Sequence, residues 1–178
     1  MILSGSAKVA GVMGWPISHS LSPRLHGYWI EQHDIDGAYV PLLVPPGGLA
    51  QALSVLPLMG FCGVNVTIPH KVDALSICHT VDRQAERVGA VNTIVVNDDG
   101  RLHGSNTDVF GFLENLRENS HWQADNGPVV LVGAGGAARA IAVGLLEAGA
   151  TEIRIINRTR SRAIELAEKI GGSTIPIL

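Results

Sequence analysis

Residues 129–138 read VVLVGAGGAA, and they indicate the fold class more strongly than any other stretch of the chain. The apolar run Val129–Val132 predicts a buried strand, and a helical pattern follows over Ala137–Glu147. The turn between them satisfies G-x-G-x-x-A after a strand and before a helix, where glycines let the backbone approach a pyrophosphate and helix N–H groups attract its charge. A merely flexible glycine turn is the alternative. The predicted dinucleotide contacts are Gly133, Ala134, Gly135, Gly136 and Ala137.

The next predicted strand, Ile153–Ile156, ends in residues that select between NAD and NADP. A site for NAD usually has an Asp or Glu there, which bonds the ribose hydroxyls. This chain has NRTRSR at residues 157–162, before a helix predicted at Ser161–Ile170. Guanidinium groups can hold a 2′-phosphate by forked, charge-assisted hydrogen bonds, although a solvated basic helix face is the alternative. We therefore predict NADP as the cofactor, bound also by Asn157, Arg158, Thr159 and Arg162.

Upstream of this stretch, short apolar runs alternate with helical patterns. Strands are predicted at Val9–Met13, Ala38–Val44, Gly63–Thr67 and Val91–Val96. A first helix is expected to begin at Ser22 as its cap, with Pro23 in its first turn, and to run to about His33. Further helices are predicted at Leu49–Leu56, Lys71–Ile77, Asp82–Val88 and Val109–Glu118. The alternation predicts an α/β protein with a mostly parallel sheet.

Composition narrows the classes of function. The 178 residues are 46% hydrophobic and 16% charged, which excludes a disordered polar chain. A net charge of −3 provides no global field for nucleic acid. No apolar run reaches the roughly 18 residues of a membrane span, and the start MILSGS does not resemble a signal peptide. We expect a cytoplasmic protein, monomeric or homodimeric, that binds neither nucleic acid nor membranes.

The two cysteines, Cys62 and Cys78, lie in apolar stretches and are interpreted as small core residues. The alternative is a metal site formed by these two cysteines together with His70 and His79. Neither CxxC nor HxxxH spacing supports it, so no metal ligand is predicted.

Polar clusters follow the predicted strands, at the sheet edge where open α/β sheets bind ligands. Ser20 and Ser22 place hydroxyls near a helix N-terminus and suit a carboxylate, although Ser22 as a simple cap is the plainer interpretation. Lys71 can polarise a carbonyl and pass a proton, although most lysines lie at the surface. Asp108, taken alone, is typical of a helix cap.

Six motifs, in order along the chain, resemble the shikimate dehydrogenase family. They are GWPISHSLSP (14–23), NVTIPHK (65–71), GAVNT (89–93), GSNTD (104–108), GAGGAARA (133–140) and NRT (157–159). The resemblance implies a reversible, NADPH-dependent reduction of 3-dehydroshikimate to shikimate, in the biosynthesis of chorismate and the aromatic amino acids. It also implies that Lys71 and Asp108 are catalytic. The implied substrate contacts are Ser20, Ser22, Thr67, Lys71, Asn92 and Asp108.

Two features depart from the family pattern. Gly27 follows His26 where the resemblance leads us to expect Asn. The chain also ends soon after the second strand–helix pair of the nucleotide-binding half, where family members continue. We expect a substrate-binding domain over residues 1–107 and an incomplete Rossmann-type NADP-binding domain over 108–178, so the 178 residues alone are expected to have little activity. An NAD-dependent quinate/shikimate dehydrogenase and a non-catalytic shikimate- or NADP-binding module are the alternatives.

Overall fold

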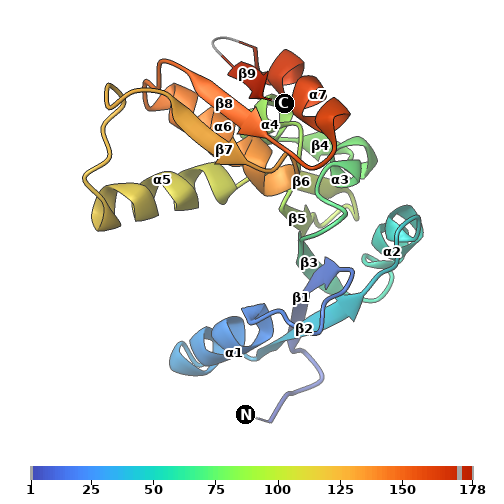
Figure 1. The fold of residues 1–178 in the computed structure, drawn as a ribbon. Helices are drawn as coiled ribbons and strands as arrows, with labels where there is room; N and C mark the ends of the chain where they lie inside the picture. Colours follow the sequence, from blue (N-terminus) through green and yellow to red (C-terminus); the bar gives the residue numbers. More distant parts are fainter. Residues whose placement is uncertain (1, 172–173, 178) are drawn as a thin grey trace. The chain divides into compact units, whose positions relative to one another are not determined.

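The computed structural model describes residues 2–171 and 174–177, which fold into two compact units (Figure 1). The first unit contains the residues up to Asp82 and the segment Val91–Ser105. The second contains Arg83–Ala90 and the residues from Asn106 onward. The chain therefore passes between the units three times. The single boundary predicted after residue 107 differs from this division, because a short helix upstream of it packs with the second unit.

The first unit is built on a six-stranded sheet. Its strands are β1 (Lys8–Gly14), β2 (Gly37–Leu43), β3 (Phe61–Val66), β4 (Thr80–Val81), β5 (Thr93–Val96) and β6 (Leu102–Ser105). Their order is β2-β1-β3-β5-β6-β4. Strand β1 is parallel to β2 and β3, and β4 is parallel to β6, whereas β5 is antiparallel to both its neighbours. The predicted α/β class is confirmed, with an antiparallel hairpin added to the parallel strands.

Strands β4 and β6 were not predicted. Strand β6 returns after the Asn97–Gly100 turn, in which the Gly100 N–H donates to the Asn97 carbonyl at 2.8 Å. Its four residues, LHGS, are too short to show a period-2 pattern. Strand β4 has only two residues and pairs with β6 alone.

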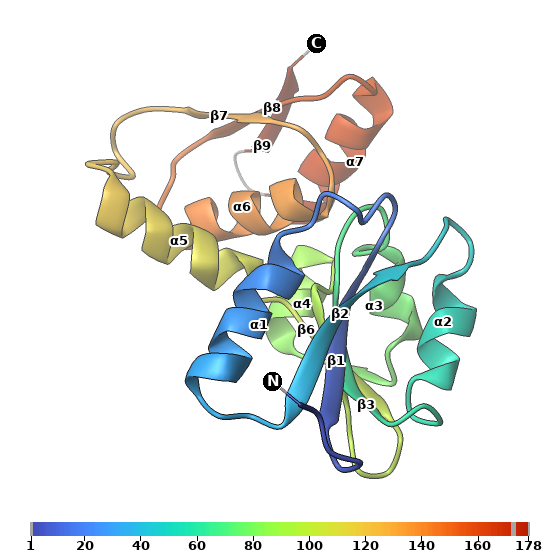
Figure 2. The same ribbon diagram turned by 90° about the horizontal axis from the view of Figure 1, so that it is seen from below.

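Three helices flank this sheet: α1 (Ser22–Gln32), α2 (Leu49–Val55) and α3 (Asp73–Ile77). Figure 2 shows α1 on one side of strands β1 to β3 and α2 on the other. The prediction that Ser22 caps α1 was wrong, because Ser22 is already the first helical residue and Leu21 stands at the cap position. The Ser20 hydroxyl instead accepts the Ser22 N–H at 3.3 Å, so a side chain outside the helix satisfies this donor.

The second unit contains a three-stranded parallel sheet. Its elements are α4 (Arg83–Val88), α5 (Asp108–Asn119), β7 (Val129–Val132), α6 (Gly136–Glu147), β8 (Ile153–Ile156), α7 (Arg160–Ile170) and β9 (Thr174–Ile177). The strand order is β7-β8-β9. Strand β9 corrects the expectation of a domain cut after two strands. Its sequence, TIPI, contains a proline, and proline in a strand is tolerated mainly at a sheet edge, which is where β9 lies.

Side chains of this sheet alternate between a buried and an exposed face. Leu131, Ile153 and Ile155 are buried in a cluster with apolar residues of α6 and α7. Val132 and Ile156 point to the opposite face and are exposed. Both strand–helix–strand crossovers place their helices on the same face, as expected for parallel strands in sequential order.

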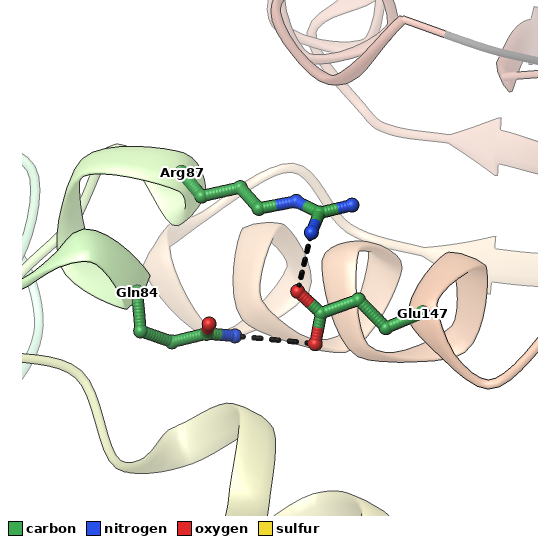
Figure 3. A network of polar contacts seen from close by, with 3 residues as sticks. All are labelled: Gln84, Arg87 and Glu147. Atoms are coloured by element: carbon green, nitrogen blue, oxygen red, sulfur yellow. Dashed lines mark hydrogen bonds and ion pairs between the residues drawn. The ribbon is translucent and has the colours of Figure 1, made fainter.

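Helix α4 is held in the second unit by apolar contacts and one polar network. Val88 and Ala90 are fully buried in a cluster with Val109, Ala140 and Val143. In Figure 3 the Glu147 carboxylate accepts from Arg87 Nη1 at 2.8 Å and from Gln84 Nε2 at 3.5 Å. Because the Arg87 side chain is 54% exposed, the ion pair contributes no more than about 0.2–1 kcal/mol. The apolar contacts are the main reason that α4 belongs to this unit.

Among residues 2–171 and 174–177, no helix is long and apolar enough to cross a membrane.

Candidate active site

Five of the six predicted substrate residues lie at one edge of the first sheet. Ser20 and Ser22 follow β1, whereas Thr67 and Lys71 follow β3, its parallel neighbour. Asn92 immediately precedes β5, which runs antiparallel to β3 and so starts at the edge where β3 ends. The topology therefore collects hydroxyl, ammonium and amide groups at the carboxyl end of the parallel strands, where open α/β sheets bind ligands.

Backbone hydrogen bonds hold the Thr67–Lys71 loop on this edge. The Thr67 N–H donates to the Met13 carbonyl at 2.9 Å, and the Val91 N–H donates to the Lys71 carbonyl at 2.7 Å. His70 is 1% exposed, and its Nε2 donates to the Val44 carbonyl at 2.7 Å. The loop is thus fixed to three neighbouring segments.

The loop after β1 approaches this segment closely. The Trp15 N–H donates to the Ile68 carbonyl at 2.8 Å. A Cβ added to Gly14 would lie 2.5 Å from Thr67 Cγ2 and 3.1 Å from the Ile68 carbonyl oxygen. Only glycine fits at this position, so the close approach of the two predicted substrate loops depends on Gly14.

Asp108 lies in the second unit, as the first residue of α5. Thr107 holds the cap position without a side-chain cap bond, and the Asn106 Oδ1 atom accepts the Asp108 N–H at 3.0 Å. The alternative of Asp108 as a simple helix cap was therefore wrong. Asp108 is half-buried.

The predicted dinucleotide turn joins β7 to α6. Gly133 has φ +120°, a backbone conformation that residues other than glycine rarely adopt. Its N–H donates to the Ile156 carbonyl at 2.7 Å. Gly135 is the exposed cap residue of α6, and a Cβ added there would meet no atom within 4 Å. Folding of this unit therefore does not require glycine at 135. The open approach to the helix N-terminus fits a bound pyrophosphate.

The end of β8 carries the predicted phosphate-reading residues. Arg158, Thr159 and Arg162 are exposed beside the first turn of α7, and the Asn157 amide donates to the Thr159 carbonyl at 2.8 Å. No Asp or Glu occurs between residues 153 and 164. The local charge is positive, which fits a phosphate better than the hydroxyls of an unphosphorylated ribose.

The two cysteines, both predicted to be core residues, differ in their burial. Cys78 is half-buried, and burial raises the pKa of its thiol to about 11, which keeps it protonated. Cys62 is exposed, so its interpretation as a core residue was wrong. In the described part of the chain, no three His, Cys, Asp or Glu side chains are grouped to hold a metal. His79 Nδ1 instead accepts the Leu102 N–H at 3.0 Å.

Sequence reasoning missed a polar network behind Asn92. It consists of Tyr39 on β2, Asn65 on β3 and Thr93 on β5, which form hydrogen bonds across the sheet. The available signal was Asn65 itself, a polar residue within an otherwise apolar strand. Polar groups in such positions generally have specific partners.

Comparisons with known proteins agree with these observations. Residues 12–94 match the shikimate dehydrogenase substrate-binding domain, and residues 116–178 match the shikimate/quinate 5-dehydrogenase family. An NADP(+) shikimate dehydrogenase of Rhodospirillum rubrum is 55% identical over 178 residues, which are 99% of this chain and 63% of that protein.

Solved structures agree with the sequence matches. The shikimate dehydrogenase of Aquifex aeolicus has a TM-score of 0.90 at 30% identity, covering 99% of this chain and 65% of that one. The Thermus thermophilus enzyme, in complex with NADP(H) and shikimate, has a TM-score of 0.82 at 40% identity, covering 95% of this chain and 63% of that one. The chain therefore spans somewhat less than two thirds of the length of these proteins.

Proposed function

Because the chain belongs to the shikimate dehydrogenase family, we propose that its protein interconverts 3-dehydroshikimate and shikimate with NADP(H). The observation that carries this proposal is the collection of Ser20, Ser22, Thr67, Lys71 and Asn92 at one sheet edge. These groups suit a small polyhydroxylated carboxylate. The hydroxyls of Ser20 and Ser22 bind the carboxylate, whereas Thr67 and Asn92 bind ring hydroxyls.

Reduction of a ketone adds a hydride to its carbon and a proton to its oxygen. NADPH, when bound, supplies the hydride. The Lys71 ammonium donates a hydrogen bond to the oxygen as negative charge develops there, and then supplies the proton. Asp108 supplies the second catalytic group, a carboxylate that accepts a hydrogen bond from a substrate hydroxyl. In the reverse direction Lys71 receives the proton.

Residues of the second unit provide the cofactor contacts in this proposal. The N–H groups at the start of α6 and the open backbone at Gly135 suit the pyrophosphate. Arg158 and Arg162 suit the 2′-phosphate by charge-assisted hydrogen bonds. These contacts position the cofactor.

The proposal is tested by assaying the protein at its natural length with shikimate and quinate, each with NADP+ and NAD+. We expect kcat/KM to be highest for shikimate with NADP+. Preference for quinate with NAD+ would support the alternative dehydrogenase. Binding of shikimate and NADP+ without turnover in any combination would support a non-catalytic module.

Replacing Arg158 by Ala is expected to weaken NADP+ binding about tenfold to a hundredfold, because it removes a charge-assisted hydrogen bond to the 2′-phosphate. Binding of NAD+, which lacks this phosphate, should change less than about twofold. Isothermal titration of both cofactors measures the effect. Arg154→Ala is the matched control, because Arg154 lies on β8 and pairs with Glu152, outside the predicted phosphate site. Equal weakening of both cofactors would contradict the assigned role of Arg158.

A further inference from the structure

We propose that Tyr39, Asn65 and Thr93 form a directed chain of hydrogen bonds that fixes the orientation of the Asn92 side-chain amide. Asn92 then presents N–H donors, and not its carbonyl oxygen, to a substrate hydroxyl. The three residues are positioning residues, since they act through Asn92. This inference rests on the proposed function for its substrate, but its geometry lies entirely within the first unit.

The register of the strands places the three side chains on one face of the sheet. Asn65 on β3 is directly opposite Thr93 on β5. Tyr39 on β2 is opposite Ala10, which is opposite Gly63, two residues before Asn65. Residues directly opposite each other, or two apart on one strand, share a face. Ala10 and Gly63 are small, so the Tyr39 side chain can extend across β1 toward Asn65.

The hydrogen bonds run in one direction across the sheet. The Tyr39 hydroxyl donates to Asn65 Oδ1 at 2.6 Å, and Asn65 Nδ2 donates to Thr93 Oγ1 at 3.0 Å. The Thr93 hydroxyl then donates to Asn92 Oδ1 at 3.0 Å. Each link uses the donor of one residue and the acceptor of the next.

The backbone determines this direction. Asn65 Nδ2 also donates to the Asn92 backbone carbonyl at 3.3 Å. A carbonyl oxygen can only accept, so a flipped Asn65 amide would place two acceptors against each other. With Nδ2 on this side, Thr93 Oγ1 accepts a hydrogen bond from Asn65, and its own hydroxyl hydrogen is donated to Asn92. Asn92 Oδ1 is therefore the end of its amide that faces Thr93.

The Tyr39 hydroxyl, the first donor in the chain of hydrogen bonds, is held in place and stays protonated. The Tyr39 ring stacks on the His26 imidazole, with centroids 3.9 Å apart and planes 9° apart. His26 Nδ1 donates to the Ser22 carbonyl at 2.9 Å, at the start of α1. Burial raises the pKa of Tyr39 to about 12, so its hydroxyl remains a donor at any pH of ordinary use. The chain of hydrogen bonds thus begins beside the predicted substrate residue Ser22 and ends at the predicted substrate residue Asn92.

A fixed amide matters because Asn92 is 8% exposed and has little contact with water. If the Asn92 amide can flip, its oxygen faces the substrate oxygen in some of the protein molecules, and substrate binding weakens. Loss of the chain of hydrogen bonds should therefore weaken substrate binding and leave cofactor binding unchanged.

The test replaces Thr93 by Val, which keeps the shape and removes the hydroxyl. In the protein at its natural length, we expect the KM for shikimate to rise about tenfold, as for loss of one well-oriented hydrogen bond. The kcat and the KM for NADP+ should stay within about twofold. Thr93→Ser should restore the KM, because serine keeps the hydroxyl. Tyr39→Phe, which keeps the ring stack, should raise the KM about threefold.

Two comparisons separate positioning from a general loss of structure. Thr80→Val removes the hydroxyl of a threonine that bonds His103 in the same sheet, and it should leave the KM unchanged. In an Asn92→Ala background, Thr93→Val should have no further effect on the KM. An equal rise of the KM with and without Asn92 would overturn the proposal.

A spectroscopic measurement tests the geometry independently of the substrate. The side-chain ¹H–¹⁵N signals of Asn92 are assigned by their loss in Asn92→Ala. We expect one sharp pair in the unmodified protein and a doubled or broadened pair in Thr93→Val. An unchanged pair would overturn the inference even in an active enzyme. If the pair changes but the unmodified protein does not turn over shikimate, the proposed function fails and the positioning chain stands.

Discussion

Lys71→Ala and Asp108→Asn are each expected to lower the kcat of shikimate oxidation by about 10²–10⁴-fold, the usual contribution of a general acid–base group. Alanine removes the ammonium to which we assign proton transfer, and asparagine removes the carboxylate of the second residue to which we assign a catalytic role. Neither residue belongs to the glycine turn or to the end of β8, so the Kd for NADP+ should stay within about twofold. Steady-state kinetics and cofactor titration on the same preparations measure both quantities.

Lys8→Ala and Asp98→Asn are the matched controls for these variants. Both residues are exposed and lie away from the carboxyl ends of the parallel strands: Lys8 begins β1, and Asp98 lies in the turn after β5. They should retain normal kinetics. A loss of NADP+ affinity comparable to the loss of kcat would contradict the assignment of Lys71 and Asp108 to catalysis.

Gly135→Asp is expected to abolish NADP+ binding while leaving the protein as stable as before, or slightly more stable. Aspartate is a preferred cap residue, and a Cβ at this position meets no atom within 4 Å. The same carboxylate would stand where we propose that the pyrophosphate binds. Repulsion of two unit charges about 4 Å apart near a protein surface is about 4 kcal/mol, equivalent to nearly 10³-fold in Kd.

Thermal unfolding and cofactor titration of Gly135→Asp are compared with those of Gly135→Asn. Asparagine has the same size and also caps helices, so it isolates the contribution of charge. We expect both variants to keep the unfolding midpoint, and the aspartate to weaken NADP+ binding by a larger factor. Normal NADP+ affinity in Gly135→Asp would place the pyrophosphate elsewhere.

Local patterns predicted the elements that are formed by consecutive residues. The strands Val129–Val132 and Ile153–Ile156 were predicted at their observed bounds, because each is a buried apolar run beside a strong turn signal. The helices α5, α6 and α7 were each predicted to within a residue of their bounds. The sheet edge that collects the predicted substrate residues could also be predicted, since polar residues follow consecutive strands.

Features that depend on distant pairing could not be predicted in this way. Strands β4 and β6 pair with each other, and neither has enough residues to show a period of its own. The packing of α4 against α6 depends on contacts between residues about 60 positions apart. The hydrogen bond between Thr93 and Asn65 could not be predicted for the same reason, because the two residues are 28 positions apart and only the antiparallel register brings them together.

The position of α4 also has a consequence for how the protein is made. Ala85 and Val88 leave the ribosome about 50 residues before α6, the helix against which α4 packs. At about 5–20 residues per second, this delay is roughly 3–10 s. During that time β5 and β6 are synthesised and can complete the first sheet, while the apolar side of α4 lacks its contacts with Ala140 and Val143 of α6. The nascent chain therefore keeps part of this apolar surface accessible to chaperones until translation reaches α6, and a ribosome that stalls in this interval would present an incomplete protein with that surface uncovered.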